Sequence, residues 1–477
     1  MRPILEEVDA ADGRRTKVAQ LARIELPYMR DLLCRSAVWR KFDRRRAAEV
    51  PVDPPASVAQ VILHRVGEWR FPSVVGVITT PTMRPDGSLL VAPGYDARTR
   101  LILVDPPPMP AIPKSPSRDD ALAALALLDD LLEEFPFADG PSRSVALSAL
   151  ITPVVRGAFP VTPMRVISAP EAGSGKSYIL DVVAAIATGQ PCPVMAAGRT
   201  EEETEKRLGA ALLAGQPLIS IDNVTGDLGG DALCQIIERP VVEIRILGKS
   251  ELVRIEARST VFATGNNLRV VGDMTRRVLR CRLDPKLERP ELRQFRRRPV
   301  AAVLAERGRY VAAALIVARA YVVAGTPDRA PRLASFEAWS DLVRSSLIWF
   351  GKPDPVATMR AAREDDPNRE MMSALFRALR DVIGVGNPKT SAEIIRLGCL
   401  GITETDDHGD GREQGRLQYP DLHDALMAVA GRSGGIDGRE LGKWLSRHRD
   451  RIAGGVRLEG RSDRHGHAAC WWLTECG

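Results

Sequence analysis

The 477-residue sequence lacks the features that mark disulfide-stapled, zinc-ribbon and membrane-spanning proteins. Its seven cysteines are odd in number and scattered, and none forms a Cys-X-X-Cys pair, which argues against a disulfide framework and a zinc ribbon. No apolar run approaches the roughly 20 residues that cross a bilayer. Residues 1–15 lack the apolar core of a secretory signal. We therefore expect a cytoplasmic chain without a membrane partner.

Aromatic residues are scarce at 5%, but 44% hydrophobic and 27% charged residues are typical of an ordinary soluble globular protein. The length predicts two to four domains. The net charge of +6 fits a nucleic-acid partner. A GC-rich genome would also enrich arginine, so the charge by itself does not decide the partner.

Two segments of unusual composition divide the chain. A proline-rich stretch at 105–116 and a polar stretch at 403–415 are typical of linkers. Between them the pattern alternates strand, loop and helix up to about residue 285, which predicts a parallel α/β sheet, and helices dominate afterwards. We expect four regions, which span residues 1–116, 117–298, 299–400 and 416–477. The first of them should be α+β, with a basic helical start over residues 1–50.

A phosphate-binding loop is predicted after the apolar strand 164–169. Glycines there let backbone amides turn toward an anion, and the N-terminus of the following helix adds its dipole. Lys176 would reach the β- and γ-phosphates of ATP, and the Ser177 hydroxyl would bind Mg²⁺. Pro170 stands where the first glycine of the motif is usual. The residues expected to surround the nucleotide are Pro170, Glu171, Ala172, Gly173, Ser174, Gly175, Lys176, Ser177 and Tyr178.

The apolar strand 217–222 ends in Asp222, which has the form of a Walker B motif and would hold the metal through its water shell. Asn223 follows, where a catalytic glutamate is usual. An amide can orient water but cannot accept its proton, so either another carboxylate acts or hydrolysis is slow.

A second strand, 259–267, ends in Asn266 and Asn267. It resembles the strand of AAA+ ATPases that lies beside Walker B, whose terminal residue, sensor 1, contacts the γ-phosphate or its water. The resemblance assigns this role to Asn266, with Asn267 as the alternative. Arg276 or Arg277 would then serve a neighbouring subunit as an arginine finger, which implies a ring, expected to be a hexamer. Taken alone, the strand 259–267 also fits a strand followed by an Asn turn, and the segment with Arg276 and Arg277 also fits a solvated basic turn.

Strands at 241–247 and 251–256 predict a β-hairpin with Lys249 at its tip. The order of these motifs resembles superfamily 3 helicases and, more closely, phage- and plasmid-type DNA primase/helicase proteins, over about residues 60–350. The resemblance implies an α/β P-loop NTPase with an AAA+-like parallel sheet, in which Lys249 grips single-stranded DNA in the pore of the ring. Without the resemblance, Lys249 is a solvated turn residue.

The C-terminal region predicts a winged helix. A helix from Gly438 to about Ile452 starts at a capping residue, Asp437, and is followed by a β-hairpin with a basic turn. Such a domain can bind duplex DNA or dock a protein. The residues expected to contact DNA are Lys443, Arg447, Arg461 and Arg464.

Two functions from different classes remain open. The first is an ATP-dependent DNA helicase or translocase in the replication of a phage or plasmid. The alternative is a nucleotide-switched DNA-binding ATPase, an origin binder or loader, that hydrolyses little. A protein remodeller is a third, disfavoured by the basic winged helix. The region before the motor lacks a cysteine–histidine cluster and an acidic metal triad, so we expect no primase activity in this chain. A separate primase is a partner that this interpretation leaves open.

Overall fold

The computed structural model describes residues 2–9, 15–65, 67–198, 200–245, 252–405, 411–432, 434–461 and 469–476. The chain divides into two compact units. The first comprises Met1–Leu268 and Arg276–Arg360, and the second comprises Arg269–Thr275 and Ala361–Gly477. This division falls after Arg360, so it differs from the four predicted regions, whose boundaries stay predictions.

A five-stranded, fully parallel sheet forms the centre of the first unit, in the order β11-β12-β16-β10-β18. The sequence prediction of a parallel α/β sheet is thereby confirmed. Every residue of β10 is buried, as expected for a strand that has a neighbour on each side and helices on both faces. The strands are β10 (Met164–Ala169), β11 (Val194–Ala196), β12 (Leu218–Asp222), β16 (Thr260–Asn266) and β18 (Val278–Arg282).

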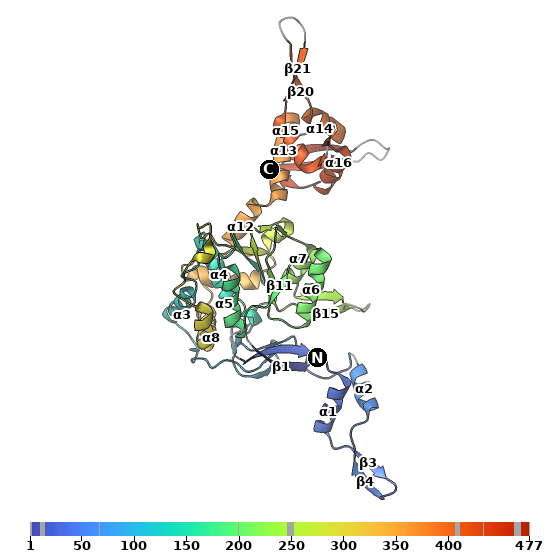
Figure 1. Ribbon diagram of the computed structural model, residues 1–477, viewed down its shortest axis with the longest axis vertical. Coiled ribbons are helices and arrows are strands. Elements are labelled where there is room, and N and C mark those ends of the chain that lie inside the picture. The colour runs from blue at the N-terminus through green and yellow to red at the C-terminus, as the bar shows by residue number, and fades with distance from the viewer. Residues whose placement is uncertain are drawn as a thin grey trace. The chain divides into compact units, whose positions relative to one another are not determined.

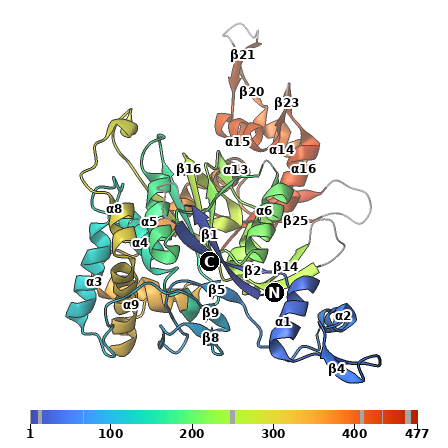
Figure 2. The ribbon, with the colours of Figure 1, turned by 60° about the horizontal axis from the view of Figure 1, so that its bottom comes forward.

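Helices cover both faces of this sheet (Figures 1 and 2). One face carries α3 (Arg118–Asp130), α4 (Gly140–Ile151), α5 (Lys176–Thr188), α8 (Pro299–Ala305) and α9 (Arg307–Val323). The other carries α6 (Glu201–Leu213) and α7 (Asp231–Glu238). The first unit also contains α10 (Glu337–Trp339), a π-helical turn (Ser340–Arg344) and α11 (Ser345–Trp349), and it contains the 3₁₀ turns Arg156–Ala158 and Pro290–Leu292. The helix α12 (Ala357–Glu364) follows.

The N-terminal part of the first unit is built from short strands and two helices. The prediction of a helical start over residues 1–50 is wrong outside α1, because the chain there forms two antiparallel hairpins, β1–β2 and β3–β4. Pairing between separated segments is not visible in a local helical period. The elements are β1 (Arg2–Asp9), β2 (Arg15–Ala22), α1 (Leu26–Ser36), β3 (Arg40–Asp43), β4 (Ala48–Pro51), α2 (Ala56–His64), β5 (Gly76–Ile78), β6 (Thr82–Met83), β7 (Leu89–Leu90), β8 (Gly94–Asp96) and β9 (Leu101–Leu103).

The predicted hairpin after the Walker B strand is present as an antiparallel pair, β14 (Val241–Arg245) and β15 (Leu252–Glu256). Its tip, including Lys249, lies outside the described residues. Two further short strands are β13 (Asp227–Leu228) and, in the second unit, β17 (Arg269–Val270), which precedes the 3₁₀ turn Gly272–Arg276.

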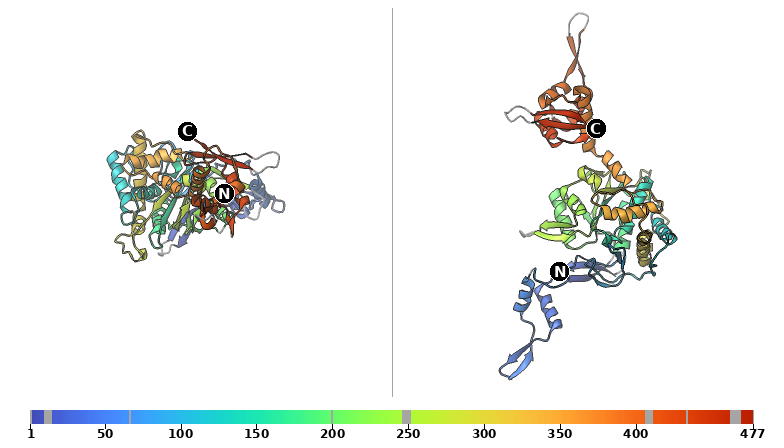
Figure 3. Two further views of the ribbon diagram at one scale, coloured as in Figure 1. Left: turned by 90° about the horizontal axis from the view of Figure 1, so that it is seen from above. Right: turned by 180° about the vertical axis from the view of Figure 1, so that it is seen from behind.

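The second unit has its own hydrophobic core, in which Leu375, Leu426 and Leu441 are buried. Its largest sheet has the order β19-β26-β25-β24, and the paired strands β25 and β26 are seen in Figure 3. The elements are α13 (Pro367–Ile383), β19 (Lys389–Thr390), α14 (Ser391–Gly398), β20 (Gly401–Thr405), β21 (Gly411–Leu417), α15 (Pro420–Ala430), β22 (Gly431–Arg432), β23 (Gly435–Ile436), α16 (Gly438–Arg447), β24 (Ile452–Ala453), β25 (Val456–Arg461) and β26 (Cys470–Glu475).

Asp437 caps α16 as the sequence predicts, because its carboxylate accepts hydrogen bonds from the amides of Arg439 at 2.8 Å and Glu440 at 3.1 Å. Among the described residues, none of the helices combines the length and the apolar character that crossing a membrane would require.

The proline-rich linker packs directly on helix α9. A Cβ atom built at Gly308 would lie 1.8 Å from the carbonyl oxygen of Pro108, so only glycine allows this approach. The predicted linker is therefore held against the first unit by a backbone contact at the start of α9.

We expect Gly308→Ala to destabilise the protein by about 1–3 kcal/mol, because the added methyl must push the linker away from α9. Gly442→Ala is the matched control, since a Cβ there has Ser391 as its nearest neighbour at 3.8 Å. Removing an interior helical glycine should stabilise by up to about 1 kcal/mol. Urea unfolding followed by tryptophan fluorescence measures both, and an equal effect of the two changes would contradict the prediction.

Candidate nucleotide-binding site

The loop between β10 and α5 has the geometry of an anion cradle. Gly173 and Gly175 have φ values of 74° and 92°, a left-handed backbone that glycine adopts without strain. Gly175 precedes the first turn of α5, and no side chain among the described residues caps that turn. Its amides are therefore available for phosphate oxygens, and the helix dipole favours negative charge there. The loop fits the phosphates of a nucleotide.

Lys176 connects this loop to the neighbouring strand. Its ammonium donates to Asn266 Oδ1 at 2.6 Å and to the carbonyl oxygen of Glu171 at 3.1 Å. Burial lowers the pKa of Lys176, while the charges of Asp222 and Glu171 act in the opposite direction. The contact with Asn266 brings together two candidate nucleotide-site residues that the sequence analysis identified in separate motifs.

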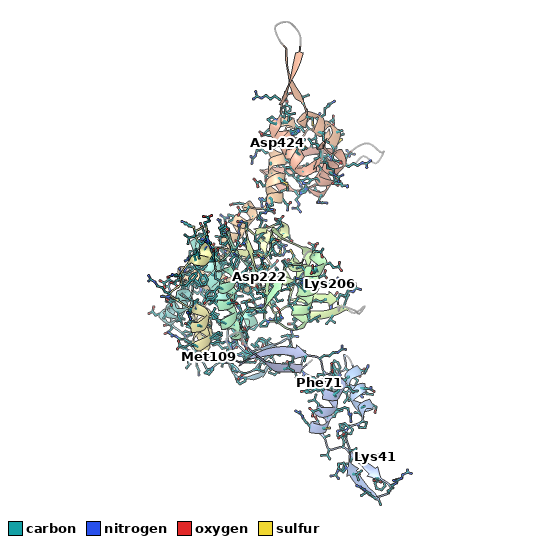
Figure 4. All side chains as sticks on the ribbon, in the orientation of Figure 1. Lys41, Phe71, Met109, Lys206, Asp222 and Asp424 are labelled. Carbon is teal, nitrogen blue, oxygen red and sulfur yellow. The ribbon has the colours of Figure 1, made fainter. Side chains whose placement is uncertain are left out.

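Two oxygen donors suited to Mg²⁺ lie at the ends of α5 and β12. Ser177 Oγ donates to Asp222 Oδ1 at 3.3 Å, and Asp222 lies in the middle of the first unit (Figure 4). Hydroxyl and carboxylate oxygens are the hard ligands that Mg²⁺ prefers, and it usually keeps several waters. The pair therefore fits the metal ion of a magnesium–nucleotide complex.

Thr264 orients the Asp222 carboxylate, a role that sequence reasoning missed. Its hydroxyl donates to Asp222 Oδ1 and accepts from the Asn223 amide at 3.2 Å. Thr264 lies two residues before Asn266 on β16, so both side chains leave the strand on one face. This alternation was the signal in the sequence that pointed to Thr264.

The two asparagines that directly follow the strands β12 and β16 have left-handed backbones. Asn223 has φ 53° and Asn267 has φ 48°, a conformation in which asparagine is enriched. Asn267 donates through its backbone N–H to Ala169 O at 3.0 Å and through its side-chain Nδ2 to Pro170 O at 3.4 Å. Asn267 thus holds the start of the loop, whereas Asn266 contacts the lysine.

Asp181 is a second residue that the sequence did not single out. It lies on α5 one turn after Ser177, and this i+4 spacing was the available signal. Burial raises the pKa of Asp181, the charge of Asp222 raises it further, and a hydrogen bond from the Cys192 amide at 3.1 Å opposes the shift. A carboxylate with a raised pKa therefore lies within electrostatic range of Asp222.

Aromatic rings line the start of α5. The rings of Tyr178 and Phe135 have centroids 6.1 Å apart, and Phe137 lies beside Phe135 at 6.3 Å. Tyr178 remains 39% exposed. The loop itself is braced by Ser174, whose hydroxyl donates to the carbonyl oxygen of Glu171 at 2.6 Å.

The two candidate finger arginines differ in environment. Arg277 is 4% exposed, and its Nε donates to Glu238 Oε2 at 2.8 Å. The Arg276 side chain is 41% exposed, and its Nη1 lies 3.7 Å from Glu238 Oε1. Of these two guanidinium groups, that of Arg276 is the more exposed to solvent.

The residues expected to contact DNA are partly described. Lys443 and Arg447 are exposed on α16, where Lys443 Nζ lies 3.1 Å from Glu440 Oε1, and Arg461 is exposed at the end of β25. Lys249 and Arg464 lie outside the described residues. Their DNA contacts stay predictions.

Comparison with known proteins identifies no family. No family model and no curated protein matches the chain. Two solved structures are titled as the apo C-terminal region of NrS-1. The first is 12% identical, the match covers 94% of this chain and 99% of that one, and the TM-score is 0.37. The second is 11% identical, with 95% and 100% coverage and a TM-score of 0.39. A structure titled SCCmec type IV Cch, active helicase, is 13% identical, with 88% and 82% coverage and a TM-score of 0.32. Likenesses this distant carry no functional argument.

We expect Thr264→Val to weaken magnesium-dependent nucleotide binding by roughly 10-fold or more, because the residues behind a metal ligand set its orientation. Thr264→Ser keeps the hydroxyl and should retain most of the affinity. Titration of a fluorescent ATP analogue with and without Mg²⁺ measures the effect. Equal losses in the two variants would contradict a specific role of the hydroxyl, because only the valine variant lacks it.

Proposed function

We propose that this chain is an ATP-dependent DNA helicase or translocase that works as a ring in the replication of a phage or plasmid. The observation that carries the proposal is the meeting of Lys176, Ser177, Asp222 and Asn266 at one edge of the parallel sheet. These side chains come from the start of α5 and from the ends of β12 and β16, and together they match the requirements of phosphoryl transfer.

Each residue has a distinct part in the proposed reaction. Lys176 neutralises charge on the β- and γ-phosphates, and Ser177 with Asp222 holds Mg²⁺, which supplies further positive charge there. Asn266 contacts Lys176 in the structure, and it can donate its amide to the γ-phosphate or to the attacking water. The aromatic ring of Tyr178 can pack against the adenine base.

Hydrolysis needs a proton acceptor, and Asn223 cannot serve as one. Asp181 is the carboxylate that we propose for this step, because it lies one turn after Ser177 on α5 and within electrostatic range of Asp222. If Asp181 does not act, the chain is better described as a nucleotide-switched DNA-binding ATPase, an origin binder or loader. The amide at position 223 is the observation that favours this second function.

Ring formation is proposed through Arg276. Arg277 is buried against Glu238, and withdrawing it would leave that carboxylate with the Ser335 hydroxyl and a weaker ion pair. Arg276 has a longer and weaker contact with Glu238 and is exposed, so it can exchange this carboxylate for the γ-phosphate of a neighbour. A hexamer is the proposed assembly.

DNA is proposed to bind at two places on the protein. The hairpin β14–β15 carries Lys249 at its tip, where it would grip the backbone of single-stranded DNA without reading sequence. The second unit packs α14, α15 and α16 beside the strands β25 and β26, an arrangement that fits a winged helix. Lys443, Arg447, Arg461 and Arg464 would bind duplex origin DNA, and a separate primase would supply primers.

The first test is steady-state ATP hydrolysis with and without single-stranded DNA. We expect DNA to stimulate the wild type, and Lys176→Ala to lower turnover by roughly 10²-fold or more because a donor to the transition state is lost. Lys249→Ala should lose the stimulation and keep the basal rate. Lys206→Ala, an exposed lysine on α6 that pairs with Glu202, is the matched control. Turnover at the Lys176→Ala background with DNA present would reject the motor and favour the switch.

A second test asks whether Arg276 acts across subunits. Arg276→Ala should lower turnover by roughly 10³-fold, the scale of other arginine fingers, without lowering the melting temperature. Mixing it with Lys176→Ala should restore part of the activity, because one variant then supplies the loop and the other the arginine. Arg277→Ala should instead lower the melting temperature. Absence of any recovery in the mixture would contradict action across subunits.

A further inference from the structure

A cavity of about 290 Å³ lies at the opposite edge of the same sheet from the nucleotide site. It is lined by Leu218, the first residue of β12, and by Ala187 and Thr188 at the end of α5. In contrast, β12 and α5 contribute Asp222 and Lys176, at their other ends, to the nucleotide site. The cavity is therefore a separate site, although both sites share these two elements.

The walls of the cavity are mostly apolar. Ile78 and Leu101 contribute from the strands β5 and β9, which lie side by side in the N-terminal part of the unit (Figure 2). Pro153, Pro191 and Leu218 continue the apolar surface. The N-terminal segment is tied to α5 by Thr79, whose hydroxyl donates to Thr188 O at 3.4 Å. Such a chamber, at the small end of ligand pockets, suits an apolar ligand body.

Two arginines line this cavity as well, Arg156 and Arg258. Arg156 is 8% exposed and donates to the carbonyl oxygens of Phe159 at 2.5 Å, Pro160 at 3.0 Å and Ala257 at 3.0 Å. Its Nε has no hydrogen-bond partner among the described residues. Carbonyl oxygens solvate a guanidinium group but do not neutralise it, so a buried positive charge remains.

The surroundings add to this positive charge. Arg165, fully buried nearby, donates to Thr152, Thr162 and the carbonyl oxygen of Pro163. Within the part of the chain that the structure describes, no acidic group contributes to the pKa shift of Arg156 or Arg165. Burial and, to a smaller extent, a neighbouring arginine charge, that of Arg258 for Arg156 and that of Arg156 for Arg165, lower the pKa of each to about 9.

The available carboxylate is shared. Arg258 Nη2 lies 3.2 Å from Glu256 Oε2, while the other oxygen of Glu256 pairs with Arg100. One carboxylate therefore faces two guanidinium groups here, with Arg156 beside them. A bound anion would relieve the repulsion and supply further negative charge for these guanidinium groups.

We propose that this cavity binds a small organic anion, whose carboxylate or phosphoryl group pairs with Arg156 and Arg258 and whose apolar body fills the space between β5, β9 and β12. Arginine suits both headgroups because its fork of N–H donors can bind them in a bidentate manner. The ligand is distinct from ATP, which is proposed to bind at the other edge of the sheet.

The test uses four probes on the full chain without nucleotide, so its outcome does not depend on the proposed ATPase activity. Octanoate and octyl phosphate carry the two headgroups, octylammonium has a similar tail with the opposite charge, and inorganic phosphate has no tail. Calorimetric titration should show binding of octanoate, octyl phosphate or both, and little of the other two. Whichever anion binds should also raise the melting temperature. Equal binding of octanoate and octylammonium, or no binding of either octyl anion, would overturn the proposal.

Two variants then locate the bound anion. Arg258→Leu should weaken binding about tenfold or more, because a charge-assisted hydrogen bond is lost. Arg254→Leu is the matched control, since Arg254 lies on β15 with its side chain 79% exposed and does not line the cavity. Equal losses in the two variants would place the anion elsewhere. If Arg258→Leu fails to fold, the comparison of octanoate with octylammonium on the wild type still decides the question.

Discussion

The parallel pairing of β16 with β10 on one side and β12 on the other is the constraint on which the rest of the candidate site depends. Ala169 lies opposite Asn266 in this register, so the phosphate-binding loop begins level with the polar end of β16. The same strand presents Thr264 to Asp222 on its other neighbour. One buried strand thereby connects the loop lysine to the Asp222 carboxylate, and a shift of one residue would turn both side chains away.

The two ends of helix α5 differ in the groups that could attract an anion. The start of α5 carries free amides and the positive end of the helix dipole, which suit phosphates. Its last turn is capped instead by Arg307, which donates through Nε to Ile186 O at 3.1 Å. Near that end, Arg156 and Arg258 line an apolar chamber. Anion binding at the start of α5 would use backbone amides, whereas near its end it would use guanidinium groups.

Local motifs were readable because their signals lie within a few residues of each other. The strand 164–169, the two loop glycines and the helix that stops at Gly189 follow from apolar runs and from the backbone needs of a phosphate loop. Asp181 and Thr264 were not identified, because their importance depends on which strand or helix faces them. The helical interpretation of residues 1–50 failed for the same reason, since hairpin pairing joins separated segments.

The sequence by itself determined the α/β class, the loop around Lys176 and the strands that end in Asp222 and Asn266, because period, turn chemistry and apolar runs are local properties. Only the tertiary structure decided that Asn266 contacts Lys176, that Arg277 is buried on Glu238, and that Arg156 lines an apolar cavity. These are contacts between residues far apart in the chain. Strand order, helix packing and burial create them, and no local pattern encodes these three.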